Sequence, residues 1–353
     1  MKAVRYYGAR DVRFEECQSP SVGPGQVLVR PTLCGICGTD LREFVDGPHW
    51  TPVQKNEFSG AELPQILGHE FAGVVEEVGP DVRSLRAGDR VSCQPIIGEH
   101  HDYYGQRAMS LFSPRSAVVG LTWPWGGMAE LVLVNEHNAV RMPEELTDEQ
   151  GALIEPTAVA VQAIDRSGMK SGDVVLVTGG GPIGALAAFM AQAAGAGHVV
   201  LSQRSEARRS KLREIQAAQQ ILDSQDPSFV EQVRASSPDG FGADVAIECS
   251  GSPLALQQCI DAVRPMGTVV IAAVVHGGVR TDPKQWFAKG INIHIANGYP
   301  SHIWPRAMKL VQTGRLPVTR LVSKTIDAKD VVEEGFLPLQ NGKGGLMKVL
   351  VRP

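Results

Sequence analysis

The stretch Asp173–Ala196 reads DVVLVTGGGPIGALAAFMAQAAGA and carries the strongest structural pattern in the chain. It begins with a short apolar, β-branched run, which is typical of a buried strand. Three glycines follow at the spacing G-x-G-x-x-G, and these are Gly179, Gly181 and Gly184. The residues after them repeat apolar side chains at helical spacing among alanines, which favour helix. The stretch therefore predicts a strand, a tight turn and a helix.

This order of strand, glycine turn and helix is typical of a dinucleotide-binding site. Gly179 permits the tight turn, Gly181 lets the backbone approach a pyrophosphate, and Gly184 lets the helix pack on the strand. Pro182 and Ile183 open the helix, whose free N–H groups and dipole favour a phosphate. A glycine turn with a purely structural role is the alternative, and it is disfavoured because both flanks fit.

The rest of the chain divides into regions of different character. From Asp173 to Asn297, apolar strands alternate with helical segments, which predicts a doubly wound parallel sheet of the Rossmann type. Residues 1–158 read mainly as short strands and turns, so we expect a separate, mainly β domain there. We therefore expect an α/β protein with domains at 1–158 and 159–297. Residues 298–353 should return to the first domain through a strand at Met347–Val351.

Composition excludes several functions. The 353 residues carry a net charge of −4, with 34 basic and 38 acidic side chains, so no electrostatic case exists for nucleic acid or an anionic membrane. No apolar run of about 18 residues occurs, and the N-terminus lacks the apolar segment of a signal peptide. We therefore expect a cytoplasmic protein with no membrane partner, whose six cysteines are thiols or metal ligands rather than disulfides.

Cys34 and Cys37 form a C-x-x-C pair with three possible interpretations. A redox pair is disfavoured because no thioredoxin-like βαβ unit surrounds it. A structural zinc would need a second cysteine pair at matching spacing, which the chain lacks. The third interpretation makes Cys37 a single catalytic ligand and Cys34 a buried side chain. His69, beside Glu70, is the candidate second ligand, although a lone histidine is more often structural.

In combination, these motifs resemble the zinc-dependent medium-chain alcohol dehydrogenases over nearly the full length of the chain. The similarity is greatest to the 2,3-butanediol (acetoin) dehydrogenases, with sorbitol and threonine dehydrogenases next. Six motifs occur along the chain in the same order as in the family, and these are CGICGTD, GHEFAGVVEEVG, GDRV, EP-x-AVA, VTGGGPIG and GGLMKVLV. The resemblance implies a Rossmann domain and a mainly β, co-chaperonin-like catalytic domain.

The resemblance also implies one catalytic zinc. Cys37 and His69 match the family's two invariant ligands, while Glu155 and Glu70 match carboxylates that serve as third ligand in different members. A thiolate, an imidazole and a carboxylate that leave one position open describe a catalytic zinc. Thr39 matches the hydroxyl that bonds the reacting oxygen and passes its proton on.

The implied reaction interconverts a secondary alcohol, such as a vicinal diol or hydroxyketone, and a ketone by hydride transfer with a nicotinamide cofactor. One alternative is a zinc-free quinone or enoyl reductase on the same frame. Another is a biosynthetic reductase of a bulkier carbonyl compound, and a third is a nucleotide-binding protein that has lost catalysis. The family forms oligomers, so we expect a homodimer or homotetramer.

The cofactor-binding residues depart from the family pattern. Gln203 stands where NAD-dependent members carry an aspartate, which bonds a ribose 2′-OH and repels a 2′-phosphate. Arg204 follows it and supplies a permanently charged donor fork suited to phosphate. We therefore expect NADP(H) rather than NAD(H), with Ser205 and Arg208 completing the set. The alternative makes Arg204 a solvated residue at the helix entry.

Two more departures concern the metal and the proton path. The family's four-cysteine lobe is missing because residues 94–120 hold no cysteine, so we expect one zinc and no structural zinc. Three neighbouring polar residues of that loop, His100, His101 and Asp102, are awkwardly spaced for a metal. Arg42 stands where the family often has a proton-relaying histidine, and an arginine cannot be deprotonated.

Three tryptophans are candidate substrate contacts. Trp50 and the pair Trp123 and Trp125 fall in loops that face the substrate in the resembling proteins. Two tryptophans around a proline would form a rigid apolar wall. Surface or interface packing is the alternative.

Overall fold

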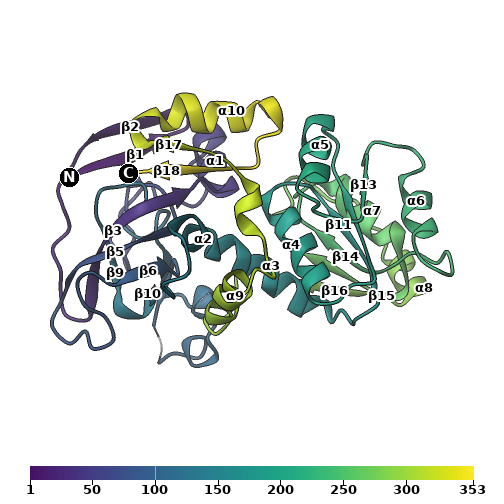
Figure 1. Cartoon of the computed structure of the whole chain (residues 1–353), viewed down its shortest axis with the longest axis horizontal. Helices are drawn as coiled ribbons and strands as arrows, with labels where there is room; N and C mark the ends of the chain where they lie inside the picture. Colours follow the sequence, from purple (N-terminus) through teal and green to yellow (C-terminus); the bar gives the residue numbers. More distant parts are fainter. Residues whose placement is uncertain (100) are drawn as a thin grey trace. The chain divides into compact units, whose positions relative to one another are not determined.

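The computed structural model describes residues 1–99 and 101–353, so His100, where a metal was considered and disfavoured, lies outside the described residues. The chain divides into two compact units (Figure 1). The first contains Met1–Glu155, Pro300–Gln312 and Val322–Pro353, and the second contains Pro156–Tyr299 and Thr313–Leu321. Within the predicted C-terminal segment 298–353, residues Thr313–Leu321 thus belong to the second unit. There the Arg320 guanidinium donates to the carbonyl of Ile215.

The first unit is built mainly from antiparallel strands. Its largest sheet has the order β10-β6-β5-β3-β18-β17, with β9 also paired to β3. A smaller sheet has the order β2-β1-β4, and β7 pairs with β8. The strands are β1 (Lys2–Gly8), β2 (Asp11–Glu16), β3 (Gln26–Gly35), β4 (Gln65–Ile66), β5 (Glu70–Val78), β6 (Arg90–Cys93), β7 (Ile96–Gly98), β8 (Ser116–Val118), β9 (Val132–Asn135), β10 (Ala139–Arg141), β17 (Val322–Asp327) and β18 (Lys348–Arg352). The helices are α1 (Gly38–Asp46), α2 (Asp148–Ala152), α9 (Ile303–Gln312) and α10 (Leu337–Gln340), while α3 (Ile154–Ser167) begins here.

The last strand of the chain lies in the sheet of the first unit. In β18, Leu350 pairs with Gly35 and Val351 with Cys34 of β3, in antiparallel register. Figure 1 shows the yellow C-terminal strand in the same unit as the purple N-terminal strands. Strand β18 therefore lies in the sheet of the N-terminal strands, and it begins beside the residues that follow β3.

The second unit is a parallel sheet with helices between its strands. The strand order β13-β12-β11-β14-β15-β16 is that of a dinucleotide-binding doubly wound fold. The strands are β11 (Val174–Thr178), β12 (His198–Ser202), β13 (Gln220–Leu222), β14 (Ala243–Glu248), β15 (Val263–Ile271) and β16 (Asn292–Ile295). The helices are α4 (Pro182–Ala193), α5 (Glu206–Glu214), α6 (Phe229–Ala235), α7 (Pro253–Ala262) and α8 (Pro283–Lys289). The predicted Rossmann-type sheet is confirmed.

Two local features differ from the sequence prediction. Helix α1 was not expected, because its nine residues carry only a short apolar pattern. The helical pattern that begins at Asp148 predicts one helix to about Ser167, but the structure has two, α2 and α3, because Leu153 leaves helical geometry with φ −94° and ψ 3°. No helix in the described part of the chain is long and apolar enough to span a membrane.

The turn of Gly179–Gly184 is closed by backbone contact. Gly179 has φ +93°, a conformation that side chains rarely adopt, and its N–H donates to the carbonyl of Ser202. A Cβ on Gly184 would collide with the carbonyl oxygen of Gly179, whereas a Cβ on Gly181 would meet no heavy atom within 4 Å. Gly184 is therefore needed for packing, and Gly181 is not.

This difference predicts opposite results for two alanine variants. We expect Gly184→Ala to lower the free energy of unfolding by about 2 kcal/mol, because the helix must shift away from the strand. Gly181→Ala should leave the unfolding free energy nearly unchanged. Chemical denaturation of both variants measures the difference, and equal stability of the two would contradict the close-packing role of Gly184.

Candidate active site

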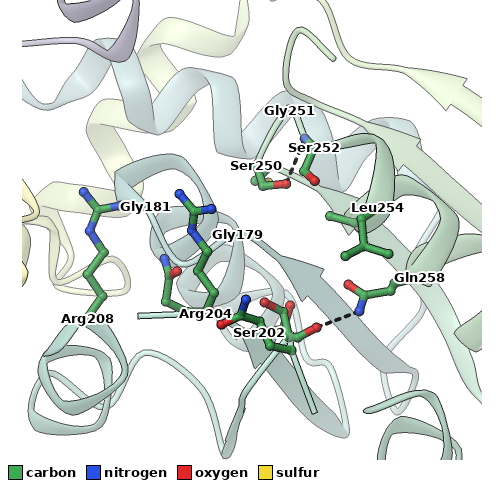
Figure 2. A pocket seen from close by; sticks show the side chains of 15 residues that line it. Gly179, Gly181, Ser202, Arg204, Arg208, Ser250, Gly251, Ser252, Leu254 and Gln258 are labelled. Carbon is green, nitrogen blue, oxygen red and sulfur yellow. Dashed lines mark hydrogen bonds between the residues drawn. The ribbon is translucent and has the colours of Figure 1, made fainter. Parts of the chain in front are cut away.

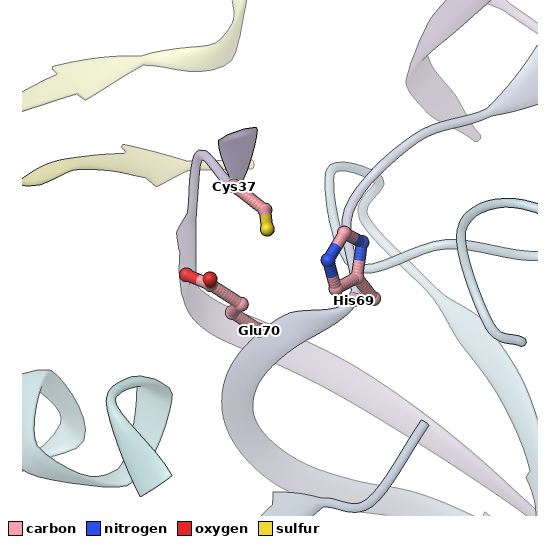
Figure 3. Close-up of side chains that lie close together, drawn as sticks. All are labelled: Cys37, His69 and Glu70. Atoms are coloured by element: carbon pink, nitrogen blue, oxygen red, sulfur yellow. The ribbon is translucent and has the colours of Figure 1, made fainter. Parts of the chain in front are cut away.

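Three potential metal ligands come together in the first unit. The ligand atoms of Cys37, His69 and Glu70 all lie within 4.8 Å of one another. Figure 3 shows the three side chains converging from two segments, one around Cys37 and one at His69–Glu70. They form the one such His/Cys/Asp/Glu group found in residues 1–99 and 101–353. In this part of the fold, three side chains that could hold a metal ion therefore lie close together.

Local backbone structure fixes the two segments. Cys37 is the N-cap residue of α1, and its N–H donates to Asp40 Oδ2 at 2.9 Å. Gly68 precedes His69 with φ +100°, and a Cβ there would lie 2.6 Å from Cys34 Sγ. The glycine therefore lets the chain turn tightly over Cys34, which is buried beneath it as the sequence predicted.

Asp40 orients the imidazole of His69. His69 Nδ1 lies 3.5 Å from Asp40 Oδ1, and both side chains are buried. Burial disfavours the charged imidazole, but Asp40 and Cys37 outweigh it and raise the pKa of His69 well above its ordinary value. With Nδ1 directed at a carboxylate, Nε2 is the ring nitrogen left for a metal, as in the carboxylate–histidine–metal arrangement.

Lys348 is a functional residue that the sequence analysis missed. It is 2% exposed, and its Nζ donates to Glu70 Oε1 at 2.9 Å, to Glu70 Oε2 at 2.6 Å and to the carbonyl of Ile36 at 3.0 Å. A buried lysine needs such acceptors because an unpaired charge in the interior is very costly. Burial opposes its charge, yet Glu70, Cys37 and Glu155 raise the pKa of Lys348. The only available signal was a lysine within an otherwise apolar strand.

Glycine at position 35 makes room for the same carboxylate. A Cβ on Gly35 would collide with Glu70 Oε2. Glu70 is 1% exposed, so it cannot move into solvent to avoid the collision. Gly35 and Lys348 together fix the position of Glu70.

Glu155 is placed differently from Glu70. It lies in the first turn of α3, is 9% exposed and is not part of the group within 4.8 Å. Its charge nevertheless contributes to the raised pKa of Lys348. The structure thus brings Cys37, His69 and Glu70 together directly and leaves the choice of third ligand between two carboxylates.

Thr39 and Arg42 lie on α1 after Cys37. Thr39 Oγ1 is 3.7 Å from Cys37 Sγ, so the hydroxyl borders the ligand group. Arg42 Nε lies 2.9 Å from Asp46 Oδ1 and donates to His49 Nε2 at 3.2 Å. The guanidinium is therefore engaged by its own helix and the following loop.

The donor set fits zinc. A thiolate, an imidazole and a carboxylate match its nitrogen, sulfur and oxygen preference. In the described structure, Asp40 Oδ1 and His69 Nδ1 are buried without a hydrogen-bond partner. Such a pair is suited to form a shorter hydrogen bond when the imidazole binds a cation. Cys93, in contrast, is buried in β6, and burial raises the pKa of its thiol.

The second unit holds a cavity of about 390 Å³ at the glycine turn. Its lining combines the ends of four parallel strands with the start of α7. Lining residues include Gly179, Gly181, Ser202, Gln203, Arg204, Arg208, Ser224, Gln225, Cys249, Ser250, Gly251 and Gln258. Pro182 opens α4 directly after Gly181, with Ile183 next. A polar cavity at a helix N-terminus and the carboxyl ends of parallel strands is suited to a nucleotide.

Two arginines face this cavity. In Figure 2 the side chains of Arg204 and Arg208 run in the same direction, so both guanidinium groups end on one side of it. Burial, followed by the charge of Arg204, lowers the pKa of Arg208. Gln203 Oε1 accepts from the N–H of Ser205, whose hydroxyl caps α5 by accepting from the N–H of Arg208. Paired cations of this kind are suited to a phosphate group.

Comparison with known proteins agrees with this geometry. Residues 23–144 match the model of the alcohol dehydrogenase GroES-like domain, and residues 182–313 match that of the zinc-binding dehydrogenase domain. The chain is 36% identical over 356 residues to an (R,R)-butanediol dehydrogenase of Bacillus subtilis, with 100% of both chains covered.

The chain belongs to the medium-chain, zinc-binding alcohol dehydrogenase family. The family and fold predicted from the motifs are thereby confirmed, and the chain is an oxidoreductase of this family.

Two solved structures extend the comparison. The 2R,3R-butanediol dehydrogenase of Bacillus subtilis superposes with a TM-score of 0.91 at 35% identity, covering 100% of this chain and 99% of the other. A zinc-binding dehydrogenase of Sinorhizobium meliloti, solved with NADP bound, has a TM-score of 0.89 at 31% identity with the same coverage. Both similarities extend over the GroES-like and nucleotide-binding parts of this dehydrogenase.

The three tryptophans have different environments within the dehydrogenase. Trp123 donates its indole N–H to the carbonyl of Leu133 at 2.8 Å and packs against the core of the first unit. Trp125 packs on the same core, while Trp50 is 37% exposed and contacts the ring of His49. Packing accounts for Trp123 and Trp125, and the substrate role of all three stays a prediction.

The buried Lys348–Glu70 pair predicts a large stability effect. We expect Lys348→Met to lower the free energy of unfolding by about 3 kcal/mol, because it leaves the Glu70 carboxylate unpaired in the core. Lys324→Met is the control, since Lys324 forms an exposed pair with Glu334 at 3.2 Å and should change stability by less than about 1 kcal/mol. Denaturant unfolding of both variants tests this, and equal effects would contradict the role given to the buried pair.

Proposed function

We propose that this dehydrogenase interconverts a secondary alcohol and a ketone by hydride transfer with NADP(H), using one catalytic zinc and no structural zinc. The observation that carries the proposal is the Cys37–His69–Glu70 group, with Asp40 behind the histidine and Lys348 behind the carboxylate. A zinc-free quinone or enoyl reductase would have no use for this buried donor set. The same argument disfavours a nucleotide-binding protein without catalysis.

Each residue of the group has a definable task. Zinc bound there would act as a Lewis acid on the substrate oxygen, and the nicotinamide would exchange the hydride. The Thr39 hydroxyl, next to Cys37, is positioned to bond the reacting oxygen and to carry its proton. Asp40 holds the imidazole so that Nε2 faces the metal. Arg42 takes no part in proton transfer, because it is engaged by Asp46 and His49.

The third zinc ligand is one of two carboxylates. Glu70 lies within the ligand group, but both of its oxygens already accept from Lys348. Glu155 is outside the group, although its charge also acts on Lys348. Either carboxylate can therefore complete the donor set, and Glu70 would have to serve the metal and the buried ammonium together.

The cofactor assignment depends on charge around the cavity. No acid occupies position 203, and Arg204 and Arg208 present two guanidinium groups to the same space. A 2′-phosphate is attracted by such a pair and would be repelled by an aspartate at position 203. The NADP bound to the Sinorhizobium meliloti relative supports this assignment.

Relatives suggest the substrate class. The names of the Bacillus subtilis proteins indicate a vicinal diol, so a diol or the corresponding hydroxyketone is the first substrate to test. A bulkier carbonyl compound is the second, because Trp50 presents a partly exposed aromatic surface. The unpaired edge strand β16, with Ile295 54% exposed, supports a homodimer or homotetramer.

Metal analysis tests the zinc assignment. The purified protein should hold one zinc per chain, and Cys37→Ser should lose it because the thiolate ligand is gone. Cys17→Ser is the control, since Cys17 lies outside the ligand group, and this variant should keep its zinc. Zinc retained by Cys37→Ser, or two zinc ions per chain, would contradict the proposal.

A single acid should reverse the cofactor preference. We expect the protein to bind NADPH more tightly than NADH, and Gln203→Asp to weaken NADPH binding by about tenfold or more through charge repulsion. NADH binding should be unchanged or improved, because an aspartate can bond the ribose hydroxyl. Gln216→Asp, an exposed change outside the cavity, is the control. Fluorescence titration measures all six affinities, and NADH preferred by the unmodified protein would overturn the assignment.

A further inference from the structure

Arg209, next to the two cavity arginines, is buried and does not line the cavity. It lies in α5 and is 8% exposed, whereas Arg204 is exposed and Arg208 is half-buried. The residues that line the cavity include Arg204 and Arg208 but not Arg209. A buried guanidinium needs partners within the protein, so its contacts indicate what it holds in place.

The contacts of Arg209 go to the segment that carries the predicted phosphate-binding residues and to Asp223, which follows β13. Nη1 donates to the carbonyl oxygens of Gln203 and Arg204, at 2.7 Å each. Nε donates to Glu206 Oε2 at 2.8 Å, and Nη2 lies 2.7 Å from Glu206 Oε2 and 2.9 Å from Asp223 Oδ2. All three nitrogens therefore have acceptors from the protein, and none is left for a ligand.

We propose that Arg209 is a positioning residue for the 2′-phosphate of the cofactor, acting through the backbone of Gln203 and Arg204. The inference rests on the proposed NADP(H) function and extends it. Arg209 does not contact the cofactor. It fixes the positions of the neighbouring side chains and pairs with the carboxylates near them.

The first part of this effect is geometric. Gln203 and Arg204 lie between the end of β12 and the start of α5, where their carbonyl oxygens have left the sheet. Arg209 Nη1 alone donates to both carbonyls, while the Gln203 N–H donates to the carbonyl of Leu222 and the Gln203 Oε1 accepts from the N–H of Ser205. The turn is thus fixed before a ligand arrives, and binding does not have to order it.

The second part is electrostatic. Asp223 directly precedes Ser224, which lines the cavity, and Glu206 lies beside Ser205 in the first turn of α5. Both carboxylates would repel a 2′-phosphate if they were uncompensated. Arg209 pairs with both of them, so the charges of Arg204 and Arg208 remain available to the cavity. The binding of a ligand without the 2′-phosphate would depend little on either effect.

The test compares two small probes that differ in the 2′-phosphate, which are 2′,5′-ADP and 5′-AMP. Both are titrated into the zinc-loaded full chain and into Arg209→Met. We expect the variant to lose about tenfold or more in affinity for 2′,5′-ADP and less than about threefold for 5′-AMP. Arg213→Met is the matched control, since Arg213 also pairs with Glu206 at 2.9 Å but bonds neither carbonyl. It should leave the ratio of the two affinities unchanged.

A second variant keeps the test informative if Arg209→Met does not fold. Arg209→Lys keeps the positive charge, but one ammonium cannot serve both carbonyls together with Glu206 and Asp223. It should weaken the binding of 2′,5′-ADP more than the binding of 5′-AMP.

Two failures can be told apart. An unmodified protein that binds 2′,5′-ADP no better than 5′-AMP would reject the NADP(H) function itself. An unmodified protein that prefers 2′,5′-ADP, together with an Arg209→Met variant that weakens both probes equally, would reject the positioning role and leave the cofactor assignment intact.

Discussion

The buried ion pair between Lys348 and Glu70 is the interaction on which the active site depends. It joins residues that are 278 positions apart, because Lys348 begins the last strand and Glu70 begins β5. Removing an ammonium from water is costly, and the cost is offset only when its acceptors are correctly placed. Two Glu70 oxygens and the carbonyl of Ile36, the residue before Cys37, meet that requirement. The C-terminal strand therefore fixes both segments that supply metal ligands.

A different constraint shapes the nucleotide-binding unit. The carboxyl ends of β11, β12, β13 and β14 meet at one edge of the sheet, and the residues that follow each strand line the cavity. Such an edge is the usual place for a ligand in an open parallel sheet. The glycine turn after β11 lets a ligand approach the backbone, and the Gln203–Arg204 segment after β12 supplies positive charge. A general nucleotide site thus comes from the fold, while the proposed cofactor selectivity depends on a few side chains on one turn.

Sequence reasoning succeeded where the signal was local. The glycine turn and the parallel, doubly wound sheet were predicted, because each belongs to a short motif with a physical requirement. Cys37, His69 and Glu70, which the sequence analysis proposed as ligands, lie close together in the structure. Lys348 and Arg209 were missed because their partners are distant in sequence or are backbone carbonyls, which no motif reveals. Helix α1 was missed because its nine residues are fixed by the Cys37–Asp40 cap rather than by an apolar repeat. The sequence also could not reveal that Glu70 shares its carboxylate with Lys348, because the two residues are distant in the chain.

The account is tested most directly by X-ray absorption at the zinc edge of the protein as purified. The predicted spectrum has one sulfur ligand at about 2.3 Å and the remaining nitrogen or oxygen ligands at about 2.0–2.2 Å. That result would establish a site with a single thiolate, as the Cys37–His69–carboxylate arrangement requires. A spectrum with two or more sulfur ligands would contradict it, because no second cysteine belongs to the ligand group found in the described residues.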